Sequence, residues 1–461
     1  MPSFVEFFAG GGFARLGLGA AWKCVLANDV SPEKAATYRA NYGAGELRLQ
    51  DIRTLAPSDI PVADLWWASF PCQDHSSAGL RVGFEGDKGS LVFEITRLLD
   101  AALAAGTGPR LIAMENVTGF VRTAGGRDFV ALVTALTSAG FRVGAVMADA
   151  NDFLPQSRQR VLLIAVRDGT EIPGGMITSR PDPASHPKVL VTAATAFPAS
   201  VAKRWVWWRL PRPMPHRLQL ADMLDPDGGA DQKWLSPERM VAFLEKVTGR
   251  DRVRLEQAMA LDHPVAATTV YVRKDMVGGY IRVQTLRTDG VAGCLMCQTK
   301  SNRQQLMIIS SGQARVRNFT PRELARLMGL PPDYRLPASE PAAVRLTGDG
   351  VVVPVVRWLA GNLLEPLLAG AEVVARPRTT ARGPAARQRK TVGAMETRAA
   401  GIKKVTVGTT AYFLPDEAAR MDTVAAEMGV SKHELIILAL DRMLAGRGEP
   451  PVRRYAQRKH P

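Results

Sequence analysis

The sequence predicts an α/β protein with a doubly wound, mostly parallel sheet, a smaller loop-rich domain and a small C-terminal module. Three observations in residues 1–178 favour this class. Short apolar runs alternate with helical stretches, a glycine turn follows the first run, and several runs end in residues suited to binding or acid–base chemistry. Parallel sheets carry their ligands at the carboxyl ends of the strands, so we expect the site there.

The first strand, over residues 5–8, breaks into Gly10-Gly-Gly12 and a helical segment over 14–21. Glycine lets the backbone approach a ligand, and a helix N-terminus offers free N–H groups, so this opening is typical of a nucleotide-binding unit. A second strand, over 22–27, ends in Asn28-Asp29. This acid lies about 20 residues after the glycines, where ribose hydroxyls are usually held.

The later strands also end in functional residue types. Helical stretches over 90–105 and 128–139 lie between them, as parallel strands require. The strand ends are Asp51 after the third strand, Pro71-Cys72 after the strand over 64–68, Glu115-Asn116 after the strand over 110–114, and Arg158 and Arg160 between the strands over 142–147 and 161–166.

From about residue 170 to 315, proline and glycine become frequent and apolar runs short, which indicates a separate loop-rich domain. Trp205, Trp207 and Trp208 cluster there; core packing is the preferred interpretation, and contact with nucleic acid is the alternative. A helix is expected from Thr320-Pro-Arg-Glu to Met328. The cysteines of Cys294-Leu-Met-Cys297 lack a second pair, so no metal is expected.

Composition favours a polyanionic partner and an intracellular location. The 461 residues carry a net charge of +15, and residues 376–461 alone hold 17 Lys and Arg against 8 Asp and Glu. Four cysteines in this length argue for a reducing compartment. We expect no membrane span, because no long uncharged apolar stretch is present, and no signal peptide, because a strand begins within the first residues.

These motifs, in this order, resemble the cytosine-5 DNA methyltransferases. The resemblance spans residues 4–178 and 317–368 and rests above all on Phe70-Pro-Cys-Gln73, Glu115-Asn-Val117 and Gln156-Ser-Arg-Gln-Arg160. It implies the S-adenosylmethionine-dependent methyltransferase fold and a DNA (cytosine-5-)-methyltransferase activity. One departure is visible: the family commonly has glycine at the position of Phe13, and Gly11 would have to compensate.

The chemistry explains the catalytic residues that the resemblance implies. Carbon 5 of cytosine is too weak a nucleophile to take a methyl group unaided, so a thiolate, here Cys72, adds to carbon 6. Glu115 assists at ring nitrogen 3 if a dry pocket keeps it partly protonated. Arg158 and Arg160 lie two apart on an extended segment and should face one side, with Arg160 suited to the cytosine carbonyl oxygen. Gln73 and Asn116 complete the expected catalytic set.

The resemblance also implies S-adenosyl-L-methionine as methyl donor. It assigns Phe8, Gly10 and Gly12 to the methionine end, Asp29 to the ribose and Asp51 to the adenine amino group. Further contacts are expected from Pro71, Leu91 and Asn362. The segment 74–89 holds four glycines and is expected to close on DNA that presents a flipped base, with an ordinary surface loop as the alternative.

The expected organisation is modular. A catalytic domain over 1–178 and 317–375 encloses a target-recognition domain over 179–316; a flexible basic linker over 376–402, a module over 403–446 and a basic tail over 447–461 follow. The module resembles a ribbon-helix-helix DNA-binding unit, with Thr406, Thr410 and Tyr412 as candidate base readers.

The expected partner is double-stranded DNA, with a homodimer through 403–446 and a cognate restriction endonuclease as further candidates, in a bacterial or phage-encoded cytoplasmic setting. The alternatives are a tRNA cytosine-5 methyltransferase and a DNA-binding regulator with a decayed catalytic domain.

Overall fold

The computed structural model describes residues 1–71, 91–229, 232–276, 279–297 and 304–369. Cys72, Gln73, the glycine-rich segment 74–89 and every element predicted beyond residue 369 therefore lie outside the described residues. The described residues all belong to one compact unit, Met1–Pro377.

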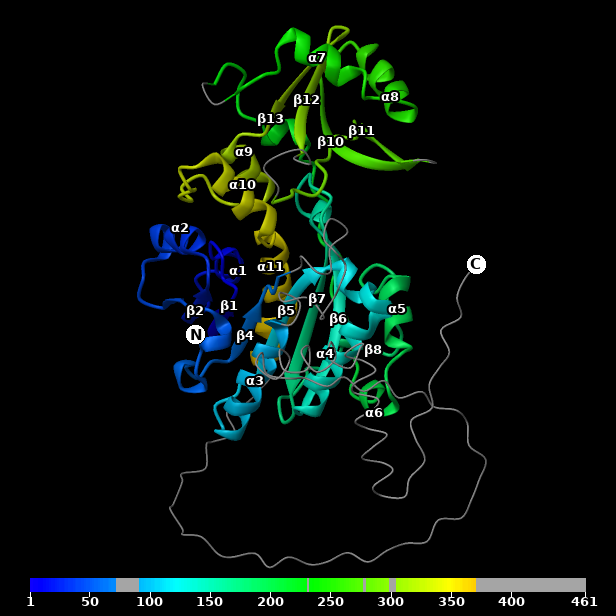
Figure 1. Ribbon diagram of the computed structural model, residues 1–461. Coiled ribbons are helices and arrows are strands. Elements are labelled where there is room, and N and C mark those ends of the chain that lie inside the picture. The colour runs from blue at the N-terminus through cyan, green and yellow to red at the C-terminus, as the bar shows by residue number, and fades with distance from the viewer. Residues whose placement is uncertain (72–90, 230–231, 277–278, 298–303, 370–461) are drawn as a thin grey trace, which may run out of the picture. The chain divides into compact units, whose positions relative to one another are not determined.

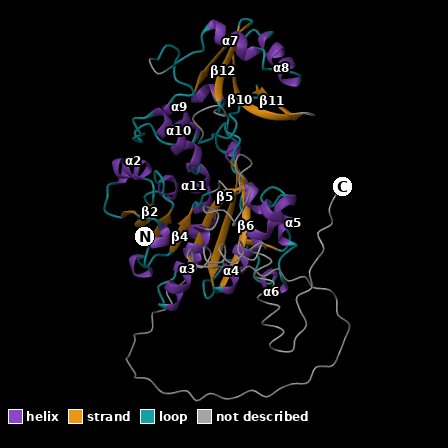
Figure 2. Cartoon of the chain, viewed as in Figure 1, coloured by secondary structure: helices purple, strands orange, loops and turns teal. Residues whose placement is uncertain are grey.

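A seven-stranded sheet forms the core of this unit, in the order β3-β2-β1-β4-β5-β7-β6 (Figures 1 and 2). All neighbouring strands pair in parallel except β7, which is antiparallel to both β5 and β6. The mostly parallel, doubly wound architecture is thus confirmed. The strands are β1 (Ser3–Phe7), β2 (Lys23–Asp29), β3 (Leu47–Leu49), β4 (Leu65–Ala68), β5 (Leu111–Val117), β6 (Phe141–Asp149) and β7 (Gln159–Arg167).

The strands are apolar on both sides because helices cover both faces of the sheet. Side chains alternate between faces along a strand, so Leu65 and Trp67 of β4 pack in one core and Trp66 and Ala68 in the other. The first core includes residues of α1 (Phe13–Leu18), α9 (Pro321–Leu327), α10 (Glu340–Asp349), α11 (Val353–Leu359) and α12 (Glu365–Ala369); the second includes α3 (Leu91–Ala104) and α4 (Arg127–Ser138).

Helix α2 (Pro32–Tyr42) follows β2 and is capped by Ser31, whose hydroxyl accepts the backbone N–H of Lys34. Short 3-10 turns connect other elements and bring strand-end residues into place. They are η1 (Ile52–Thr54), η2 (Pro57–Asp59), η4 (Thr118–Val121), η5 (Thr123–Gly126), η6 (Ala150–Asp152) and η7 (Leu220–Met223).

A four-stranded antiparallel sheet, in the order β11-β10-β12-β13, lies within residues 265–318. Its last hairpin turns at Ser311 and Gly312, both with positive φ, the geometry that a two-residue hairpin favours. The region holds more regular structure than the sequence indicated, because strand pairing depends on non-local contacts. The strands are β10 (Val265–Met276), β11 (Gly279–Arg287), β12 (Gln305–Ser310) and β13 (Gln313–Asn318), and α7 (Pro237–Leu244) and α8 (Arg250–Met259) pack on this sheet.

The tryptophan cluster belongs to the core, which confirms the preferred interpretation. The backbone of Val206 pairs with Val143 of β6, and Trp208 is fully buried. Trp205 packs edge-to-face on Phe129 of α4 at 6.0 Å. The neighbouring elements are β8 (Ile177–Thr178), β9 (Trp207–Trp208), α5 (Lys188–Ala194) and α6 (Ala199–Ala202).

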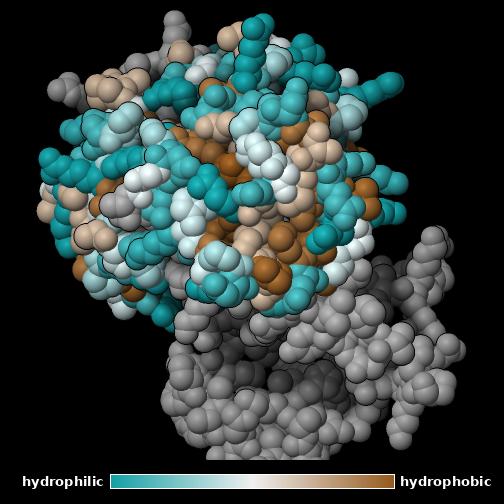
Figure 3. Space-filling view, turned by 90° about the horizontal axis from the view of Figure 1, so that it is seen from above, coloured by the Kyte–Doolittle hydropathy of each residue, from teal (hydrophilic) through white to brown (hydrophobic). Residues whose placement is uncertain are grey.

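The stretch Glu340–Ala369 is long and apolar enough to cross a membrane by length and composition. Half of its most apolar part is buried, and Leu359 and Leu363 lie in the sheet's core, as in a core helix. A π-turn, η8 (Ala360–Leu364), joins α11 to α12. Elsewhere on the surface, the face in Figure 3 shows mostly hydrophilic side chains, with apolar ones gathered near its middle.

Candidate active site

A cavity of about 530 Å³ lies where β1, β2, β4 and β5 end. Polar groups gather at this edge because parallel strands share one carboxyl end. The cavity does not include Gly12, Arg158 or Asn362 among its lining residues. Of the predicted site residues, those that line it are Phe8, Gly10, Asp29, Asp51, Pro71, Leu91, Glu115, Asn116 and Arg160.

The glycine turn bends the chain sharply under this cavity. Gly10 and Gly12 adopt φ values of 56° and 78°, and Phe8 has φ 57°, which is uncommon for an aromatic residue. Such strain costs about 1–3 kcal/mol and tends to occur at functional sites. Gly12 supports the turn from outside the cavity: its carbonyl accepts the Tyr42 hydroxyl at 3.0 Å, and an added Cβ would lie 2.5 Å from the Tyr42 ring.

Phe13 replaces the expected second glycine without distorting the backbone. It begins α1, is 3% exposed and packs edge-to-face on Tyr334 at 5.6 Å. The Tyr334 hydroxyl donates a 2.7 Å hydrogen bond to the carbonyl of Gly11. The turn is therefore held by an aromatic residue from a distant segment.

Two carboxylates stand at neighbouring strand ends. Asp29 accepts the backbone N–H of Gly10 and of Ser31, each at 2.8 Å, which fixes both of its oxygens. Asp51 caps η1 and pairs with Arg53 at 2.6 Å. Hydrogen bonds from Arg53 lower the pKa of the Asp51 carboxyl, so this group stays an acceptor.

Two other residues of the cavity lining, Glu115 and Arg160, form an ion pair. Arg160 Nε lies 2.9 Å from Glu115 Oε1, and the two side chains are 13% and 7% exposed. Asn116 is buried and donates to the carbonyl of Phe70 at 3.2 Å. The chain just before Cys72 is thus tied to the end of β5.

Arg158 has a different setting from Arg160. It is 3% exposed, and its Nη2 donates to the carbonyls of Gly348 and Gly350, both at 2.8 Å. Its Nη1 reaches Leu295 O at 3.0 Å. Arg158 does not line the cavity with Arg160, because backbone carbonyls draw its guanidinium to the neighbouring turns, but both arginines contact the Cys294 thiol.

Asn362 was expected at the donor site, and the structure places it in the helical stretch after α11. Its amide donates to Trp358 O within the helical stretch at 2.8 Å, so it does not line the cavity. This wall is formed instead by Leu346, Asp349, Gly350 and Val351. The signal that could have found it is a Gly-Asp-Gly turn before an apolar run over 351–353.

Three further charged residues of the cavity were not predicted from the sequence: Glu6, Lys34 and Arg53. Glu6 points from β1 into the sheet's edge, is 2% exposed, and burial raises the pKa of its carboxyl to about 8. Lys34 of α2 pairs with Asp349 at 2.8 Å. A buried acid inside an apolar strand was the available signal for Glu6.

A family model described as C-5 cytosine-specific DNA methylase matches residues 2–365. The chain belongs to this family. The type II methyltransferase M.NlaX of Neisseria lactamica is 27% identical over 373 residues, covering 80% of this chain and 98% of the relative. M.BsuFI of Bacillus subtilis is 27% identical over 370 residues, covering 79% and 73%.

The fold of this methylase also resembles solved structures. The Entamoeba histolytica methyltransferase EhMeth matches with a TM-score of 0.51 at 14% identity, covering 80% of this chain and 98% of that one. Together with the family match, the relatives identify the protein as a DNA (cytosine-5-)-methyltransferase. They bear out the resemblance drawn from the strand-end motifs.

Cys294 and Cys297, the cysteines of the Cys-x-x-Cys pattern, contact different residues. Cys294 Sγ accepts from Arg158 Nη1 at 3.3 Å, whereas Cys297 lies beside Asp349. Within the described ranges, no group of three or more His, Cys, Asp or Glu residues is arranged to hold a metal ion.

Proposed function

We propose that this methyltransferase acts on a cytosine flipped out of double-stranded DNA, with Cys72 as nucleophile and Glu115 as the group that assists at ring nitrogen 3. The observation that carries this assignment is the pairing of Glu115 with Arg160 on the wall of the cavity. The tether from Asn116 to Phe70 O supports it, because it fixes the backbone two residues before Cys72.

Each residue has a defined part in the reaction. The Cys72 thiolate forms a bond to carbon 6, and the π electrons between carbons 5 and 6 move to carbon 5. Glu115, in its protonated form, donates a hydrogen bond to nitrogen 3. Arg160 orients Glu115 and faces the cytosine carbonyl oxygen. Once carbon 5 carries the methyl group, its proton leaves to a base and the carbon–sulfur bond breaks, which releases the thiolate.

The cavity fits S-adenosyl-L-methionine, which supplies an electrophilic methyl group when bound. A volume near 530 Å³ lies in the range of cofactor sites. Asp29 and Asp51 offer acceptors for ribose hydroxyls and an adenine amino group, and the left-handed turn at Gly10 lets the backbone come close. In this assignment Phe8, Gly10, Pro71 and Leu91 contact the donor, while Gly12 supports the turn.

The remaining assignments extend the same proposal. The target-recognition domain lies within residues 179–316, between the catalytic segments 1–178 and 317–375, and the first part of this range, up to Trp208, packs on the catalytic sheet. The module over 403–446 binds DNA or pairs two chains, after the linker over 376–402 and before the tail over 447–461. The enzyme works in a bacterial or phage-encoded cytoplasmic context, alone or beside a restriction endonuclease.

Nucleoside mass spectrometry tests the chemistry. DNA and RNA are isolated from a methylation-deficient host that expresses the wild type or Cys72→Ala. We expect 5-methyldeoxycytidine in DNA with the wild type and none with Cys72→Ala, because without the thiolate carbon 5 is not activated. Cys24→Ala, which removes a thiol that does not line the cavity, serves as the matched control and should retain activity.

Two outcomes would contradict the proposal. Methylation that persists in Cys72→Ala would exclude this cysteine as nucleophile. 5-Methylcytidine in RNA without 5-methyldeoxycytidine in DNA would move the substrate to RNA.

A further inference from the structure

The chain between β9 and η7, residues 209–219, forms neither helix nor strand and carries no acidic residue. Its prolines, Pro211, Pro213 and Pro215, alternate with other residues. Proline fixes φ near −65° and removes a backbone donor, so this run favours an extended conformation. Part of the conformational entropy that binding would otherwise cost is therefore already lost in the free chain.

Three contacts hold this segment against the catalytic part of the chain. Leu210 is 6% exposed and belongs to the core that includes α1 and α11. The indole Nε1 of Trp358, in α11, donates to the carbonyl of Pro211 at 3.2 Å. Further along, His216 Nε2 lies 2.8 Å from the carbonyl oxygen of Asn151. The backbone is thus fixed at both ends of the proline run.

The His216 end of the segment lies at the edge of the sheet that holds the cavity. Strands β5 and β6 are both antiparallel to β7, so β6 ends at the same edge as β5. Asn151 closely follows Asp149, the last residue of β6, which pairs with Gln159 at the start of β7. Arg160, the next residue of β7, lines the cavity. A duplex that delivers a flipped base to this cavity therefore passes close to the segment.

Arg212 and Arg217 carry unpaired positive charges on this segment. Both are exposed, and neither forms an ion pair or a side-chain hydrogen bond within the described chain. Other exposed arginines are held by acids, as Arg252 is by Glu256 at 2.9 Å. A guanidinium on a fixed backbone with no acid beside it is suited to a phosphate, which it can bind through two parallel hydrogen bonds.

We infer that this segment binds the phosphate backbone of the substrate DNA, with Arg212 and Arg217 each contacting a different phosphate. The inference rests on the proposed action on double-stranded DNA. An extended chain rises about 3.1 Å per residue, so the two guanidiniums are far enough apart to reach separate phosphates. Phosphate contacts position a duplex and carry no sequence information, so the segment contributes affinity and not the choice of sequence.

Steady-state transfer of labelled methyl groups from S-adenosyl-L-methionine to unmethylated genomic DNA tests this with the full-length chain. We expect Arg212→Gln and Arg217→Gln each to raise KM for DNA by about threefold or more and to leave kcat within about twofold, because a phosphate contact stabilises the bound substrate and the transition state alike. Plots of log kcat/KM against log salt concentration should become shallower by about one for each variant, since one fewer counterion is released. Arg212→Lys should keep most of the salt dependence, because it keeps the charge.

Arg142→Gln is the matched control. Arg142 is also exposed and without an ion pair in the described chain, but it lies at the start of β6, at the opposite edge of the sheet from the cavity. This variant removes the same charge, so we expect it to change neither KM nor the salt dependence. If it acted as strongly as Arg212→Gln, net charge would account for the effect, and the inference would be overturned.

Two other results overturn it. Wild-type KM and salt dependence in both Arg212→Gln and Arg217→Gln would show that neither arginine contacts a phosphate. Losses that differ between genomic DNAs of high and low GC content would assign the arginines to base edges instead. A wild type that methylates RNA and no DNA would contradict the proposed function itself, and the inference would fall with it.

Discussion

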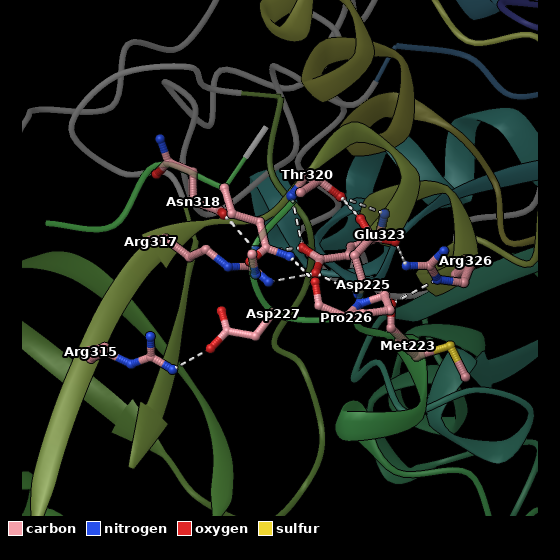
Figure 4. A network of polar contacts seen from close by, with 12 residues as sticks. Met223, Asp225, Pro226, Asp227, Arg315, Arg317, Asn318, Thr320, Glu323 and Arg326 are labelled. Atoms are coloured by element: carbon pink, nitrogen blue, oxygen red, sulfur yellow. Dashed lines mark hydrogen bonds and ion pairs between the residues drawn. The ribbon is translucent and has the colours of Figure 1, made fainter. Parts of the chain in front are cut away.

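This methyltransferase has two arginine–glutamate ion pairs of low exposure, one at the cavity and one inside the protein. On the cavity wall, Arg160 Nε lies 2.9 Å from Glu115 Oε1, and the two side chains are 13% and 7% exposed. Arg317 and Glu323 meet through two bonds of 2.7 Å and are 2% and 0% exposed. The second pair joins the end of β13 to α9, and Figure 4 shows it within a wider polar network.

The two pairs differ in the groups that surround the glutamate carboxylate. Glu323 also accepts the backbone N–H of Thr320 at 2.8 Å and of Asp225 at 2.9 Å, so protein groups surround both of its oxygens. Glu115 instead faces a cavity that a ligand can enter. A buried charge enclosed by protein serves structure, and one that faces a cavity is available for chemistry.

Breaking the enclosed pair should have the largest effect on stability. Arg317→Met leaves the Glu323 charge buried without its partner, and we expect a loss of about 3–5 kcal/mol in the free energy of unfolding. Denaturant titration followed by circular dichroism measures it. Arg315→Met, on the same strand but 51% exposed, is the control. An equal loss in both variants would show that burial does not distinguish these arginines.

Breaking the cavity pair should affect catalysis more than folding. Glu115→Gln keeps the shape but removes the acid, and we expect methyl transfer to fall by about 100- to 1,000-fold. The free energy of unfolding should fall by only about 1–2 kcal/mol. Transfer of labelled methyl groups to unmethylated genomic DNA gives the rate. If the variant unfolds as readily as Arg317→Met, the contrast between the two pairs is wrong.

Cavity residues at the ends of strands could be predicted from the sequence. Cavity residues contributed by distant segments of the chain could not. Asp29 and Glu115 were predictable because each terminates an apolar strand. The carbonyl groups that hold Arg158 outside the cavity lining could not be predicted locally, because they lie 137 to 192 residues away. Asn362 matched a local Gly-Asn pattern, whereas the actual wall residue, Asp349, pairs with Lys34 across 315 positions.

Glu6 is a third buried acid, and it lies at the cavity. Its effect on stability should depend on pH, which gives a further test of how burial acts on a carboxyl group. Burial raises the pKa of its carboxyl from 4.5 to about 8. The folded chain keeps a proton that the unfolded chain releases, so this contribution to stability is present below about pH 4.5 and is lost as the pH rises towards about 8.

Glu6→Gln removes that dependence while keeping an oxygen for the backbone N–H groups of Ala14 and Arg15. We expect the variant to match the wild type near pH 4.5 and to exceed it by about 1–3 kcal/mol above pH 8. Denaturant titrations across this range measure the difference. A constant difference at every pH would mean that the Glu6 carboxyl titrates alike in the folded and unfolded chain.

The smallest effect on stability should come from Asp227, at the exposed edge of the polar network around Arg317 and Glu323 (Figure 4). Asp227 pairs with Arg315 at 2.7 Å, and both side chains are more than half exposed, so water and salt screen the attraction. Asp227→Asn should lower the unfolding midpoint slightly at low salt and not at all at high salt. Thermal unfolding at both salt concentrations measures it. If the midpoint still falls at high salt, Asp227 behaves like a buried charge such as Glu323, because salt does not screen a charge that is shielded from solvent.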